Sequence, residues 1–141
     1  MSKEPTYHVR YETSTMVWVT FEFEGFHKYK DADDEVSYLR KRHRHIFKVR
    51  AEVEVFHDDR EIEFISLKNF LQRYSNHVNL NNKSCEMLCD IFADAIIEKY
   101  KLAELYDTLG KKTRRIMIEV SEDGENGAYK IYHPSIIKEM A

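Results

Sequence analysis

Three histidines are spaced along the chain so that they can bind one metal ion. His27 ends a run of alternating apolar and polar residues that starts at Met16, and His43 and His45 open a second alternating run that continues to Phe56. Residues of one parity point to one face of a strand, and in an antiparallel hairpin the end of one strand lies beside the start of the next. The spacing therefore predicts that the three imidazoles meet at one end and on one face of a hairpin.

Three imidazoles that meet in this way can form a zinc site of the catalytic kind. Zinc prefers tetrahedral nitrogen ligands, and three protein ligands leave the fourth position to water or a substrate. The competing interpretation is a solvated basic segment, because residues 40–44 also contain three arginines and one lysine. The in-phase position of His27 favours zinc bound by His27, His43 and His45.

The hydrophobic pattern predicts the elements that hold these histidines. Besides the strands at 16–27 and 43–56, it predicts one helix after an N-cap at Ser66 and a second after an N-cap at Ser84, ending before Gly110. Alternation returns at 116–121 and 128–132, which predicts two final strands. The charged segment 28–42 has no apolar period and is predicted to be a long loop.

This order of elements predicts an α+β fold, in which one antiparallel four-stranded sheet has two helices on its apolar face. The opposite face carries charged residues such as Arg50 and Glu52 together with Trp18, a composition typical of surfaces where subunits meet. With 141 residues and no linker or internal repeat, the chain is predicted to be one domain, 1–141, whose segments 1–14 and 134–141 are peripheral.

The composition narrows the class of protein. A hydrophobic fraction of 43% suffices for a core, and a net charge of -3 argues against a chain built wholly to bind nucleic acid. The sequence has no long apolar run and no signal-like start, so we expect a cytoplasmic protein without a membrane span. Cys85 and Cys89 lie four residues apart without further zinc ligands at a usual spacing, and we expect reduced, half-buried thiols.

Six segments, in the same order, resemble motifs of the 6-pyruvoyl-tetrahydropterin synthase and 6-carboxytetrahydropterin synthase family, over about residues 17–132. The first two are "FEFEGFH", which ends at His27, and "HRHIFKVRAEVEV", which starts at His43 and is similar to the family's strand opening with His-Gly-His. The next three, "IEFISLKNFL", "NHVNLN" and "NKSCEML", are similar to a helix entry, an Asp-His-x-x-Leu-Asn motif and a second helix start. The sixth is the alternation that ends at Glu122 and is followed by Tyr129.

The resemblance implies a fold and a ligand set. The fold is the tunnelling fold (T-fold), ββααββ, assembled into trimers or hexamers, with zinc on His27, His43 and His45. The implied substrate is a pterin held by Glu122, whose carboxylate can accept paired N–H bonds from the aminopyrimidinone edge. Glu119 is the alternative anchor, although it is out of phase with the apolar residues of its strand. The alternative for Glu122 is a turn carboxylate without a ligand.

The resemblance also implies a general base, His77. In the family an aspartate precedes this histidine, whereas this chain has Asn76. An amide can orient the imidazole but cannot stabilise its protonated form as a carboxylate does. We therefore expect His77 to be a weaker proton acceptor than in the family, and its alternative is an ordinary exposed loop histidine.

The largest departure from the family is a missing cysteine. The family usually has a catalytic cysteine a few residues before His-x-His, where this chain has Ser37 and Leu39, neither of which supplies a thiolate. Some members use a glutamate instead. Glu35 is our choice for that role over Asp34, because its side chain has the longer reach.

These features predict a lyase of the pterin synthase type that acts on 7,8-dihydroneopterin triphosphate, with Arg40 and Arg42 among the cations for the triphosphate. The expected product is the 6-carboxy pterin of 7-deazaguanine (queuosine and preQ0) biosynthesis, and the 6-pyruvoyl product comes second. The alternative is a zinc- and pterin-binding relative with lost or altered activity, which the missing cysteine and Asn76 favour. Nucleic-acid binding through residues 40–45 is disfavoured by the acidic segment before them and by the net charge.

Overall fold

The computed structural model describes residues 3–110 and 113–137. In chain order its elements are β1 (Thr15–His27), a short 3-10 helix (Asp34–Arg40), β2 (His43–Val55), α1 (Phe64–Ser75), α2 (Cys85–Tyr100), β3 (Ile116–Glu122) and β4 (Asn126–Tyr132). The predicted domain also takes in residues 1–2, 111–112 and 138–141, which lie outside the described residues.

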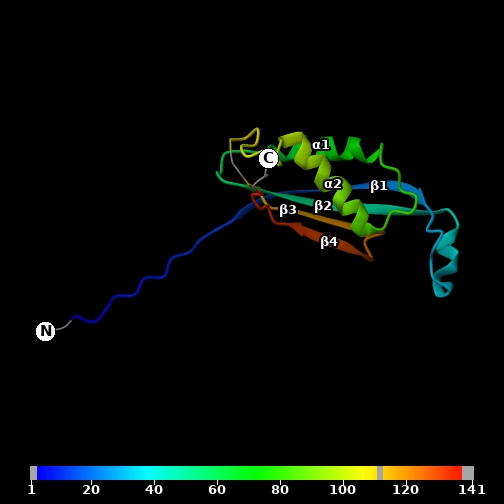
Figure 1. Ribbon diagram of the computed structural model, residues 1–141, viewed down its shortest axis with the longest axis horizontal. Coiled ribbons are helices and arrows are strands. Elements are labelled where there is room, and N and C mark those ends of the chain that lie inside the picture. The colour runs from blue at the N-terminus through cyan, green and yellow to red at the C-terminus, as the bar shows by residue number, and fades with distance from the viewer. Residues whose placement is uncertain (1–2, 111–112, 138–141) are drawn as a thin grey trace.

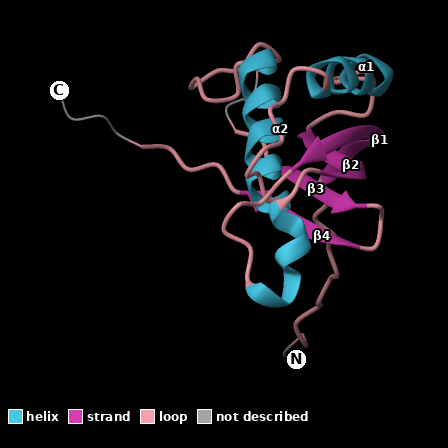
Figure 2. Ribbon diagram, turned by 90° about the vertical axis from the view of Figure 1, so that its right-hand side faces the viewer, coloured by secondary structure: helices cyan, strands magenta, loops and turns pink. Residues whose placement is uncertain are grey.

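The four strands form one antiparallel sheet in the order β1-β2-β3-β4. Helix α1 packs mainly on β1 and helix α2 on β3 and β4, so both helices cover the same face (Figure 1, Figure 2). This arrangement confirms the predicted α+β class and the four-stranded antiparallel sheet. The more specific T-fold assignment stays a prediction.

Aromatic rings fill the space between the sheet and the helices. Phe47 of β2 and Phe92 of α2 are fully buried, and the ring of Phe23 lies 5.2 Å from Phe47 and 6.0 Å from Phe92. Full burial of such a side chain contributes about 1.5–3 kcal/mol. The imidazole of His27 continues this row, with its ring centre 5.3 Å from that of Phe47. The histidine end of the hairpin is thus anchored directly on the core.

Helix α2 begins as predicted, whereas α1 does not. The Ser84 hydroxyl accepts a hydrogen bond from the Met87 N–H, which confirms Ser84 as the N-cap of α2. The prediction of Ser66 for α1 is wrong. Glu63 is the N-cap, because its two carboxylate oxygens accept the N–H groups of Ile65 and Ser66 at 3.0 and 2.6 Å. A capping glutamate therefore starts the helix at Phe64, earlier than the apolar period indicates.

The segment predicted as a long loop contains a short helix, which is a correction. The 3-10 helix Asp34–Arg40 buries none of its residues and has a kink at Val36, so its sequence carries no helical apolar period. A hydrogen bond from the Tyr29 N–H to the Leu39 carbonyl, at 2.7 Å, folds the segment back toward the end of β1. Figure 1 shows it projecting beyond the β1–β2 end of the sheet.

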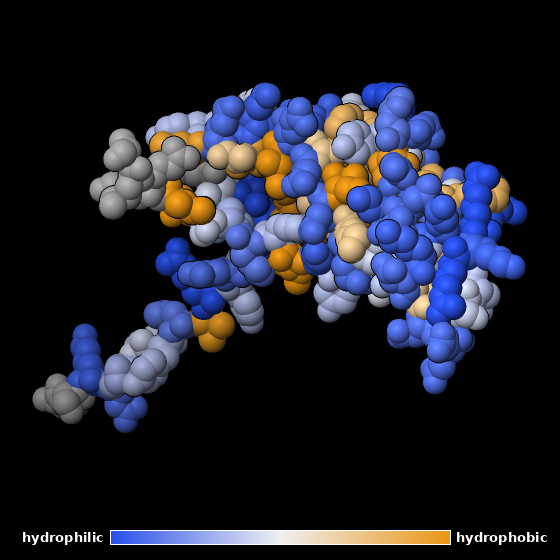
Figure 3. All heavy atoms as spheres, turned by 45° about the vertical axis from the view of Figure 1, so that its right-hand side comes forward, coloured by the Kyte–Doolittle hydropathy of each residue, from blue (hydrophilic) through white to orange (hydrophobic). Residues whose placement is uncertain are grey.

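The N-terminal segment of the described residues lies apart from the packed body. Residues 3–14 are exposed and extend away from the sheet (Figure 1, Figure 3). Figure 3 also shows a body surface that is mostly hydrophilic, with small apolar patches between charged residues. Within the described ranges, no helix combines the length and the apolar composition needed to cross a membrane.

Candidate metal centre

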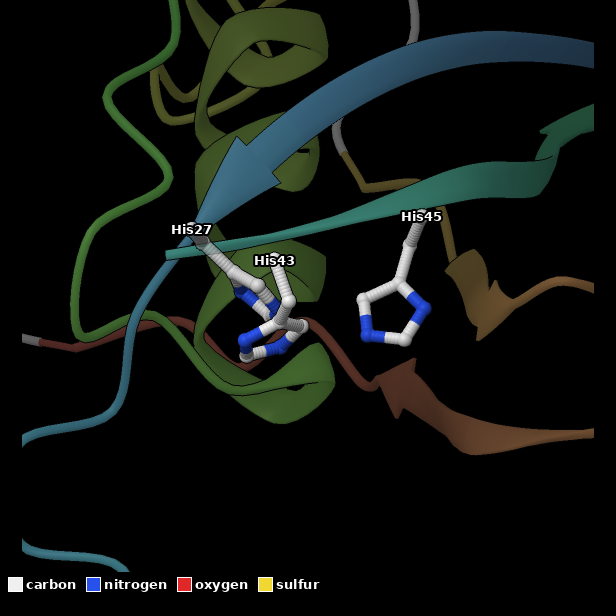
Figure 4. Close-up of side chains that lie close together, drawn as sticks. All are labelled: His27, His43 and His45. Carbon is white, nitrogen blue, oxygen red and sulfur yellow. The ribbon is translucent and has the colours of Figure 1, made fainter. Parts of the chain in front are cut away.

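The β1–β2 register brings the three histidines together. His27 is paired directly with His43 across the two strands, and His45 lies two residues along on the same face, opposite Gly25. The ring centres are 4.4 Å apart for His27 and His43, 4.8 Å for His43 and His45, and 5.2 Å for His27 and His45. Figure 4 shows all three rings on one side of the strands. The predicted convergence of the three imidazoles is confirmed.

The ring nitrogens of these histidines divide into two sets. The Nδ1 of His43 lies 2.8 Å from the Lys41 carbonyl, and the Nδ1 of His45 lies 2.7 Å from the Asp123 carboxylate. His27 has a backbone hydrogen bond to Lys83. By contrast, the Nε2 atoms of His27 and His45 are buried without a hydrogen-bond partner among residues 3–110 and 113–137.

This division fits a metal site. Metal-binding histidines in proteins typically give one ring nitrogen to an outer partner and the other to the ion. A buried nitrogen without a partner is otherwise costly. One ligand atom from each of His27, His43 and His45 lies within 4.8 Å of the others, close enough for one ion. The chemistry of three imidazoles suits zinc among other divalent metals, so the donor set fits the predicted ion.

The protonation state of His27 also favours metal binding. Burial, followed by the neighbouring His43, lowers the pKa of His27 below its usual 6.5, while Glu122 acts in the opposite direction. A neutral imidazole is the form that binds a metal. The buried member of the site is therefore held in its ligand form at neutral pH.

Glu122 completes the cluster from the third strand. It pairs with Phe47 in the β2–β3 register, and its carboxylate oxygens lie 3.7 Å from His27 Nε2 and 3.5 Å from His45 Nε2. Glu119 instead pairs with Arg50 and lies on the opposite face of the sheet. Of the two glutamates considered as pterin anchors, only Glu122 shares a face with the histidines.

A cavity of about 400 Å³ opens beside the histidines, between the end of the sheet and the start of α2. Small-molecule pockets in proteins measure about 300–1,000 Å³, so a bicyclic ligand is within its capacity. Its lining combines metal-ligand, acidic and apolar groups, among them His27, His43, Glu122, Cys85, Glu86 and Leu39. A larger hollow of about 630 Å³ includes Glu119 in its lining, but none of the three histidines.

The predicted catalytic residues lie outside this cavity lining. Glu35 is exposed on the 3-10 helix, and it is Leu39 of the same helix that lines the cavity. Asn76 and His77 are exposed just after the end of α1. The structure therefore groups none of Glu35, Asn76 and His77 with the histidine cluster within one chain.

The two arginines predicted for phosphate binding already have partners. Arg40 donates to the Ala32 carbonyl at 2.9 Å and to Asp34 at 2.8 Å. The guanidinium of Arg42 stacks over the ring of Phe26, 4.5 Å from its centre. Binding of a triphosphate by either residue requires these contacts to be exchanged.

Sequence reasoning missed two residues of the site. Asp123 contacts His45. Its sequence context is that of an ordinary turn, and its position next to Glu122 is the one sequence signal that pointed to the site. Cys85 also lines the cavity. It is the first residue of helix α2, and the parity argument, which applies to strands, could not predict its position. Burial, and then the charge of Glu122, raises the pKa of Cys85 to about 12, so it offers no thiolate at neutral pH in the metal-free protein.

Comparison with known proteins adds no relative to this picture. No model of a known protein family matches the chain, and no curated protein matches it. The interpretation of the site therefore depends on its own geometry and on the sequence motifs that surround the three histidines.

Proposed function

We propose that this protein binds zinc through His27, His43 and His45 and acts on a pterin in the adjoining cavity. The observation that carries the proposal is the convergence of three imidazoles that each have an outer partner, while two buried Nε2 atoms have none in the described part of the chain. The fold class and the order of the sequence motifs support a T-fold enzyme of the 6-carboxytetrahydropterin synthase type.

The residues of the cavity take distinct roles in this proposal. The histidines hold the ion, and zinc, when bound, supplies Lewis-acid polarisation of a substrate oxygen. Glu122, on the same face as the histidines, accepts the paired N–H groups of the aminopyrimidinone edge. Leu39 and the start of α2 exclude water from one side of the cavity.

The proposed substrate is 7,8-dihydroneopterin triphosphate, and the proposed product is the 6-carboxy pterin that leads to 7-deazaguanines. Arg40 and Arg42 are the proposed phosphate contacts, once they release Asp34 and Phe26. A cytoplasmic location belongs to the same proposal, in keeping with the two free thiols at Cys85 and Cys89.

A second candidate function is zinc and pterin binding without turnover. Leu39 lines the cavity from the segment where the family has its cysteine, and an alkyl side chain transfers no proton. Glu35 and His77 are both exposed, outside the cavity lining. These positions favour a protein that holds the ligand in place and leaves it unchanged.

Assembly bears on the choice between these functions. β1 and β4 are the outermost strands of the sheet, and open sheet edges favour pairing with another chain. We propose a closed ring of three or six copies, in which Asn76 and His77 of one copy reach the cavity of the next. A monomer in light scattering at micromolar concentration would contradict this assembly.

One experiment separates the two functions. Purified protein is analysed for metal content, and the same sample is incubated with 7,8-dihydroneopterin triphosphate while pterin products are followed by chromatography. We expect about one zinc per chain in the parent and loss of zinc in His45→Ala. Zinc with product supports the synthase, and zinc without product supports the binding protein. Full zinc occupancy in His45→Ala would overturn the metal assignment itself.

A further inference from the structure

Asp123 joins the turn between β3 and β4 to strand β2 through three hydrogen bonds. Its backbone N–H donates to the Ile46 carbonyl at 2.7 Å, and its Oδ1 accepts the Ile46 N–H at 2.8 Å. Its second carboxylate oxygen, Oδ2, lies 2.7 Å from the Nδ1 of His45. The backbone of Ile46 thus occupies one oxygen, and the other is directed at a histidine of the metal centre.

The backbone conformation at this position holds the carboxylate in place. Asp123 has a φ of 58°, in the left-handed region that aspartate tolerates better than most residues, and Gly124 follows with a φ of 73°. Two successive positive φ values are typical of the tight turns that connect paired antiparallel strands. The Asp123 carboxylate is therefore held against His45 by the turn as well as by its own hydrogen bonds.

The three histidines differ in the charge of their outer partners. The Nδ1 of His43 meets a backbone carbonyl, that of Lys41, and His27 is bonded to the backbone of Lys83. His45 alone among the three has a carboxylate as its outer partner in the described residues. A hydrogen bond to an ionised acceptor is about twice as strong as a neutral one, and it makes the opposite ring nitrogen a better metal donor.

We propose that Asp123 is a positioning residue for the metal centre, which acts through His45. It holds the His45 ring with its proton on Nδ1 and its Nε2 toward the ion, and it strengthens Nε2 as a ligand. The inference rests on the proposed metal site but not on any reaction at it. The two neighbouring acidic residues then have different roles. Glu122 lines the cavity, whereas Asp123 binds the outer nitrogen of the metal ligand His45.

The test is the zinc affinity of Asp123→Asn, measured by competition with a chromophoric chelator. The asparagine oxygen can still accept the Ile46 N–H, whereas its amide nitrogen is a donor and cannot accept a hydrogen bond from the Nδ1–H of His45. Loss of an outer-shell partner of this kind typically weakens metal binding by about 10–100-fold, and we expect a loss in that range. The visible spectrum of the cobalt(II) form should change in the same variant, because the ligand field of His45 changes.

Controls separate this role from a structural one. Glu125→Gln changes an exposed residue of the same turn and should keep the parent affinity. The metal-free forms of the parent and of Asp123→Asn are also unfolded in urea. A weaker zinc affinity with nearly unchanged metal-free stability supports the proposal. An unchanged zinc affinity, with or without a loss of metal-free stability, overturns it. Absence of zinc binding by the parent would instead overturn the proposed metal centre.

Discussion

The two ends of strand β2 both bury polar groups, and they differ in how those groups are paired. At the Val55 end, Arg114 is fully buried, donates to Asp107 at 2.6 Å and to the Glu54 carbonyl at 3.0 Å, and forms an ion pair with Glu61. Opposite charges meet there, and within the described residues only the Nη2 of the guanidinium lacks a hydrogen-bond partner. We call this group the Arg114 cluster.

At the other end, three imidazoles meet, with carboxylates beside them. His27, His43 and His45 each bring one ligand atom within 4.8 Å of the others. The Glu122 carboxylate lies 3.7 Å from the Nε2 of His27 and 3.5 Å from the Nε2 of His45, while Asp123 contacts the Nδ1 of His45. Imidazoles do not neutralise one another as an arginine and two carboxylates do. The Arg114 cluster is thus largely paired within the chain, whereas the histidine cluster leaves two buried Nε2 atoms without a hydrogen-bond partner among the described residues, as a site for an added metal ion would.

The largest effect is expected from breaking the Arg114 cluster. Arg114→Met removes the cation and leaves Asp107 and Glu61 buried without it, which should lower the free energy of unfolding by about 3–5 kcal/mol. Urea unfolding followed by circular dichroism measures the loss. The control is Arg115→Met, since Arg115 is partly exposed and its contact with Glu54 should contribute only about 0–1 kcal/mol. Equal losses in the two variants would mean that the Arg114 cluster has no special structural role.

The next effect is stabilisation by zinc. A ligand that binds only the folded state at 100 times its Kd raises the free energy of unfolding by about 2.7 kcal/mol. We expect this gain in the parent and its loss in His45→Ala, measured by thermal unfolding with and without zinc. Arg114→Met should keep the gain, because effects of distant sites add. If zinc stabilised His45→Ala as much as the parent, the ion would be bound elsewhere.

A smaller effect is expected from pH in the metal-free protein. The pKa of His27 is lowered in the folded state, so the unfolded chain binds more protons once the pH falls toward the usual value of 6.5. Stability should therefore be complete above that pH and decline below it, in urea unfolding with a chelator present. His27→Gln should have a shallower decline than the parent. An identical pH dependence would contradict the pKa shift of His27.

The last prediction concerns the reactivity of the two cysteine thiols, of which Cys85 lines the cavity beside the histidines. Burial raises the pKa of Cys85 to about 12 and that of Cys89 to about 11, so thiolate is scarce at neutral pH. We expect both thiols of the folded, metal-free protein to react slowly with a thiol-specific disulfide reagent, and rapidly once urea unfolds it. Fast reaction of Cys85 in the folded protein, with Cys85→Ser as the control, would show a reactive thiol in the cavity.

Much of the fold and of the candidate metal centre could be predicted from the sequence, because the sheet and the convergence of the three histidines both depend on strand parity. The alternation before His27 and after His43 determines which face each side chain takes, and antiparallel pairing then places the three rings together. The same parity places Glu122 on the face of the histidines and Glu119 on the opposite face of the sheet. Local signals of this kind need only a few neighbouring residues, and for that reason the strands and the cap at Ser84 agree with their predictions.

Only the tertiary structure decided which other groups reach the histidines. Asp123 contacts His45 across 78 positions of sequence, and Cys85 and Leu39 come to the cavity from elements that carry no parity signal of their own. The exposed positions of Glu35 and His77 likewise depend on how the 3-10 helix and the segment after α1 pack. Contacts between distant segments are set by the packing of whole elements, whereas the faces of a strand are set by each residue and its immediate neighbours.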